Sequence, residues 1–288
     1  MKKHLPFLSL LLFVPLLFSC KGSKTTEAAK KTQERNLKVI RIKGSETVRP
    51  VVEKVIEQFA AINPNIYVEY EGGGSGLGLM ALKQQETDIA FVSRPFTTQE
   101  QTELDTAKKF TQRNLAYDGI SIVVNLANPL REISTEQLQG IYSGKITNWK
   151  ELGGKELPIL VYSRDVSSGT FTFFKEKVLD TLEYTKEDIN LVHNKEIVNN
   201  ILQSPGAIGY VGHGSVDPNL RVLKLSARGS NKFIEPNYAS IKTGEYSLSR
   251  NLYYLFPKNS PDYVLQLDSF LRSPSVRQVI SETGFIPE

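Results

Sequence analysis

Short apolar runs alternate along the chain with segments whose apolar residues recur every three or four positions. The run LKVIRIK at 37–43 is short and rich in β-branched residues, which is typical of a strand. The following segment places Val55 and Phe59 on one helical face, with Pro50 in the favoured first turn. This order recurs as far as a helix expected at 274–284. The alternation predicts an α/β fold.

Further elements are expected from the same pattern. The capping-box pair Ser134 and Gln137 indicates the start of one helix, and a second helix is expected at 194–204. Apolar runs indicate strands at 66–71, 88–93, 119–125, 157–163, 206–211, 221–227 and 252–256.

The first residues do not follow this pattern. Lys2 and Lys3 precede an apolar stretch that ends just before Cys20, which is the organisation of a secretory signal peptide, expected at 1–19. Residues 20–36 are polar and lack aromatic side chains, so they are expected to form a flexible tether.

Cys20 is the only cysteine, which excludes a disulfide within the chain. The run LFSC around it resembles a bacterial lipobox, in which the cysteine is lipidated and becomes the new amino terminus. The resemblance implies an exported protein, held at the periplasmic or cell-surface side of a membrane by a lipid on Cys20.

Composition and charge restrict the partners. The 288 residues suffice for one large or two medium domains, and 40% hydrophobic with 23% charged residues is ordinary for a globular protein. The formal charge of +4 is small, and the lysines and arginines are spread along the chain. We therefore expect no nucleic-acid partner.

Three turns rich in glycine, serine and threonine each follow an expected strand and precede a helix. They lie at 44–47, 72–76 and 167–170. A helix start offers unpaired N–H groups and a partial positive charge, so it binds oxyanions readily. Capping alone explains any one of these turns. Three of them at the carboxyl ends of strands favour a shared anion site.

Two arginines lie beside these turns. Arg164 precedes the turn at 167–170, and Arg94 follows the strand at 88–93. A guanidinium presents a planar fork of donors that matches a tetrahedral oxyanion. Taken alone, each arginine is better explained as a surface charge, with Asp165 as a partner for Arg164.

Motifs of other functions are absent from the sequence. The glycine-rich run at 72–78 lacks the Gly-Lys-Ser/Thr ending of a nucleotide P-loop and fits the dinucleotide fingerprint only loosely. There is no Gly-x-Ser-x-Gly elbow, and neither His193 nor His213 belongs to a metal-binding or catalytic pattern. We therefore expect no catalytic residue, no metal and no cofactor.

Seven phrases together resemble the phosphate-binding proteins of bacterial Pst-type ABC transporters, in the shorter, lipoprotein-like branch. The resemblance covers residues 37–286 and is carried by GSETVRP, YEGGGSGLGL, DIAFVSRPFTTQE, DGISIVVNLANPL, IYSGKITNWKELGG, LPILVYSRDVSSGT and GAIGYVG. It implies a two-lobed periplasmic-binding-protein-like fold of type II, with an α/β sheet in each lobe and a ligand cleft between the lobes.

The resemblance also implies a discontinuous layout. Lobe 1 would comprise residues 37–117 and 218–288, and lobe 2 would be the inserted segment 118–217. The hinges would lie near Tyr117–Asp118 and His213–Val216.

Carried over position by position, the resemblance implies a phosphate site made of uncharged donors and one or two guanidinium groups. Glu46 would contribute only its backbone N–H, because its carboxylate repels an anion. In another branch of the family, an aspartate that accepts the proton of hydrogen phosphate stands where this chain has Arg94. Asp165 and Asp118 are alternative acceptors. The residues implied are Ser45, Glu46, Thr47, Ser75, Gly76, Ser93, Arg94, Arg164, Ser168, Gly169 and Thr170.

The function implied is capture of inorganic phosphate and its delivery to the permease subunits of an ABC transporter, by a protein that is not an enzyme. Two alternatives remain open from the residues. One is a receptor or sensor for another tetrahedral oxyanion, such as sulfate or molybdate. The other is a secreted hydrolase of phosphate esters.

Overall fold

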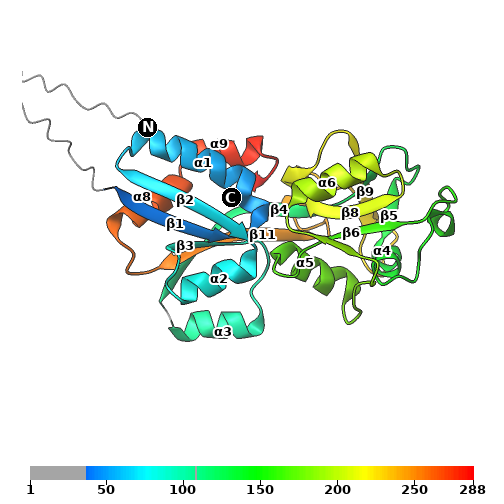
Figure 1. Cartoon of the computed structure of the whole chain (residues 1–288), viewed down its shortest axis with the longest axis horizontal. Coiled ribbons are helices and arrows are strands. Elements are labelled where there is room, and N and C mark those ends of the chain that lie inside the picture. Colours follow the sequence, from blue (N-terminus) through cyan, green and yellow to red (C-terminus); the bar gives the residue numbers. More distant parts are fainter. Residues whose placement is uncertain (1–36, 108) are drawn as a thin grey trace, which may run out of the picture. The chain divides into compact units, whose positions relative to one another are not determined.

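The computed structural model describes residues 37–107 and 109–288, as a mixed α/β structure (Figure 1). The expected signal peptide, the lipidated Cys20 and the tether at 20–36 lie outside the described residues. Within those residues, no helix combines the length and the apolar character that crossing a bilayer requires.

Strands with crossover helices make up the first part of the chain. As predicted, the segment after β1 is a helix that begins next to Pro50. The elements of this first part of the chain are β1 (Lys38–Gly44), η1 (Glu46–Val48), α1 (Arg49–Ile62), β2 (Ile66–Gly73), α2 (Ser75–Lys83), β3 (Ile89–Val92), α3 (Thr98–Ala107) and β4 (Phe110–Asn125).

The middle of the chain repeats this organisation with shorter elements. The predicted capping box of α4 is present, because Ser134 and Gln137 exchange side-chain and backbone hydrogen bonds. The elements are β5 (Glu132–Ser134), α4 (Thr135–Tyr142), η2 (Trp149–Leu152), β6 (Leu160–Arg164), α5 (Gly169–Phe174), η3 (Lys175–Leu179), β7 (Ile189–Leu191), α6 (Asn194–Gln203), β8 (Ala207–Gly212), η4 (His213–Ser215), β9 (Leu220–Ser226), β10 (Phe233–Ile234) and α7 (Tyr238–Lys242).

The last elements return to the first sheet. Helix α9 begins at the predicted Pro274 and is capped by the side chain of Ser273. The elements are β11 (Ser249–Pro257), α8 (Asp262–Leu271), α9 (Pro274–Glu282) and β12 (Ile286–Pro287).

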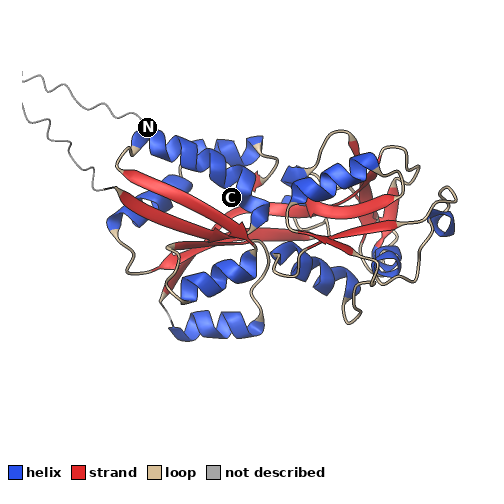
Figure 2. Cartoon of the chain, viewed as in Figure 1, coloured by secondary structure: helices blue, strands red, loops and turns tan. Residues whose placement is uncertain are grey.

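Paired strands form a path in the order β2-β1-β3-β11-β4-β8-β6-β7 (Figure 2). Strand β1 is parallel to β2 and β3, whereas β11 runs antiparallel to β3 and β4. The 16-residue strand β4 joins the two parts of the path. Its first portion pairs with β11, and its last residues pair with β8 and β9.

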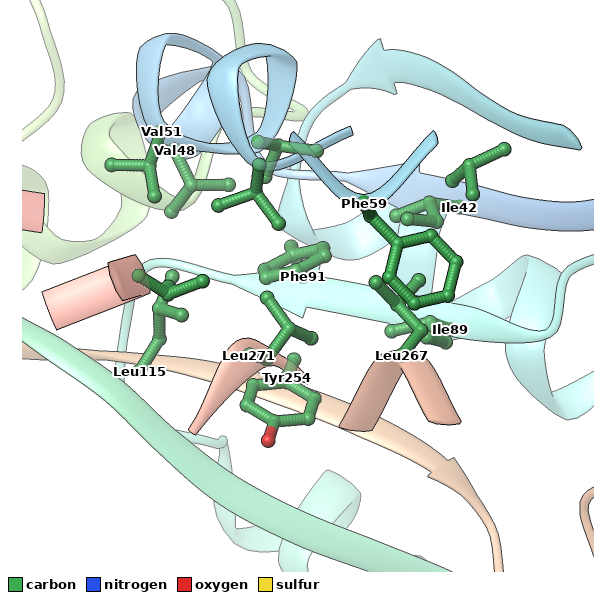
Figure 3. Packing of buried hydrophobic residues seen from close by; sticks show 14 of the residues in the cluster. Ile42, Val48, Val51, Phe59, Ile89, Phe91, Leu115, Tyr254, Leu267 and Leu271 are labelled. Atoms are coloured by element: carbon green, nitrogen blue, oxygen red, sulfur yellow. The ribbon is translucent and has the colours of Figure 1, made fainter. Parts of the chain in front are cut away.

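Separate hydrophobic clusters fill the two ends of this path. In the first, α1, α8 and α9 cover one face of the sheet, where Phe59, Phe91, Tyr254 and Leu267 pack together (Figure 3). Helix α2 covers the other face through Leu79 and other residues. The second large cluster is formed by β4, α4, α5 and β8 with their neighbours.

The second lobe boundary differs from the sequence-based prediction, which placed 218–288 in lobe 1. Strand β9 is the antiparallel neighbour of the last residues of β4. Leu223, Ile241 and Tyr246 belong to the hydrophobic cluster of the inserted segment. The boundary predicted after residue 217 is therefore wrong, because residues 220–248 bury their apolar side chains with that segment. Below, the first lobe denotes 37–117 and 249–288, and the second lobe denotes 118–248.

Candidate anion-binding site

The three predicted turns lie where β1, β2 and β6 end, and two of them do cap helices. The Oγ of Ser45 accepts a hydrogen bond from the backbone N–H of Thr47 at 3.2 Å. Ser168 caps α5 in the same way, by accepting from the N–H of Thr170 at 3.2 Å. Capping therefore accounts for these serine side chains, and it fixes the position of the threonine that follows each of them.

Threonines from the two lobes meet directly. The Oγ1 atoms of Thr47 and Thr170 lie 3.0 Å apart, within hydrogen-bonding distance. The Oγ of the neighbouring Ser167 lies 2.7 Å from the carbonyl oxygen of Gly73. The turn after β6 in the second lobe thus contacts the turns after β1 and β2 in the first lobe.

Two serines of the first lobe lie against the start of α5. Ser75 opens α2, and its Oγ accepts from the backbone N–H of Ser93 at 3.0 Å. Both serines are buried. A Cβ on Gly169 would lie 2.3 Å from the Oγ of Ser75 and 3.0 Å from that of Ser93. The absence of a side chain at Gly169 therefore lets the two lobes approach.

Arg164 ends β6 and is buried without a carboxylate partner. Its guanidinium donates to the carbonyls of Leu191 and Val192 and to Oδ1 of Asn194, at 3.3, 2.6 and 2.6 Å. Among the described residues, it forms no salt bridge with an acidic side chain. Burial lowers its pKa to about 10, because the charged form is poorly solvated. These three bonds use three of its five N–H donors.

Asp165 does not pair with Arg164, although it is adjacent in sequence. Its Oδ1 accepts from the hydroxyl of Ser167 at 2.6 Å and from the N–H of Ser167 at 2.9 Å. The Ser167 hydroxyl, followed by its N–H, holds the pKa of Asp165 below its ordinary value. This carboxylate shapes the turn after β6 and forms no ion pair with Arg164.

Arg94 is engaged elsewhere. Its Nη1 and Nη2 donate to the carboxylate of Glu100 on α3 at 2.6 and 2.7 Å, and Nη1 also donates to the carbonyl of Pro95. A charge neutralised in this way is a weak attractor for a further anion. Arg94 is therefore held against α3, whereas its neighbour in sequence, Ser93, lies beside Ser75 and Gly169.

The carboxylate of Glu46 is held by donors from three parts of the fold. Arg49 binds both oxygens at 2.8 Å, Gly73 donates its N–H at 3.1 Å, and Nδ1 of His193 in the second lobe lies 3.1 Å away. Burial raises the pKa of Glu46, but Arg49 and His193 together outweigh it and leave the pKa below its ordinary value.

Sequence reasoning missed one residue of this region, Arg250 at the start of β11. Its guanidinium is fully buried and donates to Oδ2 of Asp118 from Nε at 3.0 Å and from Nη2 at 2.7 Å. It also donates to the Oγ1 of Thr170 at 2.9 Å and to that of Thr47 at 3.3 Å. No local motif marks Arg250, because its partners are 80 or more residues away in the sequence.

Comparison with known proteins identifies the family. A model described as "PBP superfamily domain" matches residues 23–281. The phosphate-binding protein PstS of Staphylococcus saprophyticus is 35% identical over 248 residues, which cover 83% of this chain and 74% of that protein. This chain belongs to the PBP superfamily and to the PstS family within it.

Other members and solved structures agree with this assignment. The PstS of Bacillus subtilis is 28% identical over 100% of this chain and 95% of its own length. A putative phosphate ABC transporter substrate-binding protein with bound phosphate from Clostridium perfringens superposes with a TM-score of 0.78, 26% identity and coverage of 87% and 99%. An ABC-type phosphate transport receptor from Vibrio cholerae superposes with a TM-score of 0.71 and 31% identity, over 86% of this chain and 100% of its own.

The likeness to these structures confirms the predicted fold class, a two-lobed α/β fold of the periplasmic-binding-protein type. Within residues 37–107 and 109–288, no group of three or more histidine, cysteine, aspartate or glutamate side chains is arranged to hold a metal ion.

Proposed function

We propose that this PstS-family chain captures inorganic phosphate outside the cytoplasm and delivers it to the permease subunits of an ABC transporter. The observation that carries the proposal is the buried guanidinium of Arg164, which has no carboxylate partner among the described residues and lies beside the turn that opens α5. A buried cation without a counter-charge is costly, and a bound anion removes much of that cost.

The groups around Arg164 suit a tetrahedral oxyanion. Hydroxyl groups from both lobes and the backbone N–H groups at the start of α5 can donate hydrogen bonds to an oxyanion. The helix start also carries a partial positive charge. A hydrogen bond to a charged partner contributes about 1.5–3 kcal/mol, so several of them give high affinity. The proposed ligands are Ser45, Glu46 (backbone N–H), Thr47, Ser75, Gly76, Ser93, Arg164, Ser168, Gly169 and Thr170, with Arg94 adjacent.

The choice of phosphate is supported by the relatives. Those from Staphylococcus saprophyticus and Bacillus subtilis are named phosphate-binding proteins, and the Clostridium perfringens structure contains phosphate. We further propose that Cys20 is lipidated and that residues 20–36 tether the folded part to the membrane surface. A protein with this role binds its ligand without converting it, so we propose no enzymatic activity.

Calorimetry on the purified chain tests the proposal. Phosphate is expected to bind with a Kd below about 10 μM, equivalent to roughly −7 kcal/mol. Sulfate and molybdate are expected to bind more weakly. Weaker binding of phosphate than this threshold, or displacement of phosphate by sulfate, would contradict phosphate as the ligand. Turnover of a chromogenic phosphate ester would support the hydrolase alternative.

Substitution Arg164→Met separates the site from the rest of the molecule. We expect phosphate affinity to fall at least 100-fold, or about 3 kcal/mol, because the uncompensated charge is lost. The melting temperature of the ligand-free protein should be maintained, since a costly buried cation is removed. Arg41→Met is the control, because Arg41 is an exposed side chain paired with Glu69. Unchanged affinity in Arg164→Met would place the anion elsewhere.

A further inference from the structure

Arg250 lies behind the threonines of both lobes and differs from Arg164 in its charge balance. Arg250 and Asp118 are register partners on β11 and β4, and their side chains form a salt bridge with both side chains at 0% exposure. The remaining Asp118 oxygen, Oδ1, accepts from the backbone N–H of His213 at 3.0 Å. Because Asp118 neutralises Arg250, this arginine does not offer an unpaired positive charge to an anion.

The contacts of Arg250 with the threonines fix the direction of their hydroxyl hydrogens. Nη1 donates to the Oγ1 of Thr170 at 2.9 Å, and Nη2 donates to the Oγ1 of Thr47 at 3.3 Å. A hydroxyl has one hydrogen and two acceptor positions, and its hydrogen cannot point at an N–H donor. Each threonine therefore accepts from Arg250 and directs its own hydrogen away from it.

The two threonines also hydrogen-bond to each other, which determines where the remaining hydroxyl hydrogen can go. Because their Oγ1 atoms are 3.0 Å apart, one hydroxyl donates to the other. The accepting threonine then receives hydrogens from Arg250 and from its neighbour, which fills both acceptor positions. Its own hydrogen is left for an acceptor outside this group. Ser168 and Gly169, which begin α5, directly precede Thr170 in the sequence.

We propose that Arg250 is a positioning residue of the anion site, which leaves one hydroxyl of the Thr47–Thr170 pair as a hydrogen-bond donor toward the bound oxyanion. Arg250 belongs to the first lobe and donates to a threonine of each lobe, so this donor is oriented when the lobes meet. This inference rests on the proposed capture of phosphate. Its effect on affinity passes through the two threonines, and it does not require Arg250 to contact the ligand.

The test is to remove the charged pair as a unit. Asp118→Asn/Arg250→Gln leaves no unpaired buried charge, so the protein should fold, and its melting temperature serves as the check. We expect calorimetry to show phosphate binding 10- to 100-fold weaker than in the wild-type protein. An unchanged phosphate Kd in this folded variant would reduce the pair to a purely structural role and overturn the proposal.

A second background distinguishes positioning from direct contact. In Thr47→Val/Thr170→Val, whose side chains keep their shape but lose their hydroxyls, phosphate is titrated into the millimolar range. Adding Asp118→Asn/Arg250→Gln to this background should change the Kd less than about threefold, since nothing remains to be positioned. A further loss of tenfold or more would show that Arg250 acts on the anion itself and would overturn the proposal.

Arg250→Lys provides an independent variant. Lysine keeps the charge opposite Asp118 but cannot reach both threonines with a planar fork of donors. We expect this variant to fold and still bind phosphate at least tenfold more weakly, whereas full affinity would contradict the proposal. The wild-type titration in the same series separates the two ideas. Absence of phosphate binding there contradicts the proposed function, while a defect or its lack in the variants concerns Arg250.

Discussion

Three arginines near the same turns show how much a residue's role depends on its partners. Arg94 is neutralised by Glu100, and Arg250 is neutralised by Asp118. Arg164 is bound by carbonyl groups and an amide, and it forms no ion pair with a carboxylate of the described residues. Burial lowers the pKa of both Arg164 and Arg250, and attraction to Asp118 opposes this effect only in part for Arg250. Of these three, Arg164 is the charge that a bound anion would balance.

Glycine at position 169 is a second requirement at the residue scale. We predict that Gly169→Ala lowers phosphate affinity by 10-fold or more, because its Cβ would lie 2.3 Å from the Oγ of Ser75 and force the lobes apart. The fold of each lobe should be retained, since the clash arises between them. Calorimetry with phosphate, together with far-UV circular dichroism, measures both effects.

Gly76→Ala is the matched control for this change. Gly76 lies in the first turn of α2, and the nearest atom to a Cβ there is the carbonyl oxygen of Ser167 at 3.9 Å, an ordinary contact. Alanine keeps the backbone N–H and favours the helix. Affinity within about threefold of wild type is expected. Equal losses in the two variants would refute the packing argument.

At the scale of elements, the site is made by strands that end at one place. β1, β2 and β3 are joined by parallel pairing of β1 with the other two, so their carboxyl ends lie at the same edge. β6 brings its own end, with Arg164, from the second lobe. Helix starts after these strands have local signals in the sequence, such as Ser168 before α5, and these were predictable.

A half-buried acidic residue, Asp188, directly precedes the short strand β7. Asp188 accepts from the hydroxyl of Ser163 on β6 at 2.5 Å and from Asn190 at 2.6 Å, while its Oδ1 is buried without a partner. Burial raises its pKa to about 6, and these two hydrogen bonds only partly oppose that shift. Because the pKa of Asp188 is higher in the folded than in the unfolded protein, its contribution to stability is most favourable below about pH 4 and is lost as the pH rises through about 6.

We therefore predict that Asp188→Asn raises the melting temperature at pH 8 and has little effect near pH 4. Ionisation of Asp188, whose pKa is about 6 in the folded protein, costs about 1 kcal/mol of stability at pH 8, because the side chain is partly exposed and its charge is screened. The expected gain at pH 8 is about 2–4 °C. Differential scanning calorimetry at both pH values measures it.

Glu57→Gln is the corresponding control on an exposed position of α1. Its effect should be small and similar at both pH values. A melting temperature of Asp188→Asn that equals wild type at pH 8, or a gain of the same size at pH 4, would contradict the assigned cause.

At the scale of the molecule, the lobes are joined by β4 and β11 and by contacts from the site itself. Thr47 meets Thr170, Ser167 bonds to Gly73, and Glu46 lies against His193. These contacts come from the same turns that are proposed to hold the anion. Ligand binding and lobe contact are therefore expected to reinforce each other.

The proposed anchor is also a property of the whole molecule. We predict that Cys20→Ser, expressed in a bacterial cell, moves the protein from the membrane fraction to the soluble extracytoplasmic fraction. The lipid would be absent, and no described helix can replace it. Phosphate affinity should be unchanged, since residues 37–288 carry the proposed site. Retention of Cys20→Ser in the membrane fraction would contradict lipidation at this position.

The sequence by itself determined features that depend on neighbouring residues. Periodicity predicted helices α1 and α9, and the spacing of Ser134 and Gln137 predicted the capping box of α4. Helix faces and caps can be predicted in this way because they are encoded within a few positions. The phrases shared with the Pst family then supplied the two-lobed fold, which the comparisons confirm.

Only the tertiary structure decided which of the marked residues have partners. It placed 220–248 with the second lobe, because β9 pairs with β4 across about a hundred residues of sequence. It neutralised Arg94 with Glu100 and left Arg164 without a carboxylate. It also brought Arg250 against Thr47 and Thr170. Burial and ion pairing are set by contacts between distant segments, and such contacts have no local signature in the sequence.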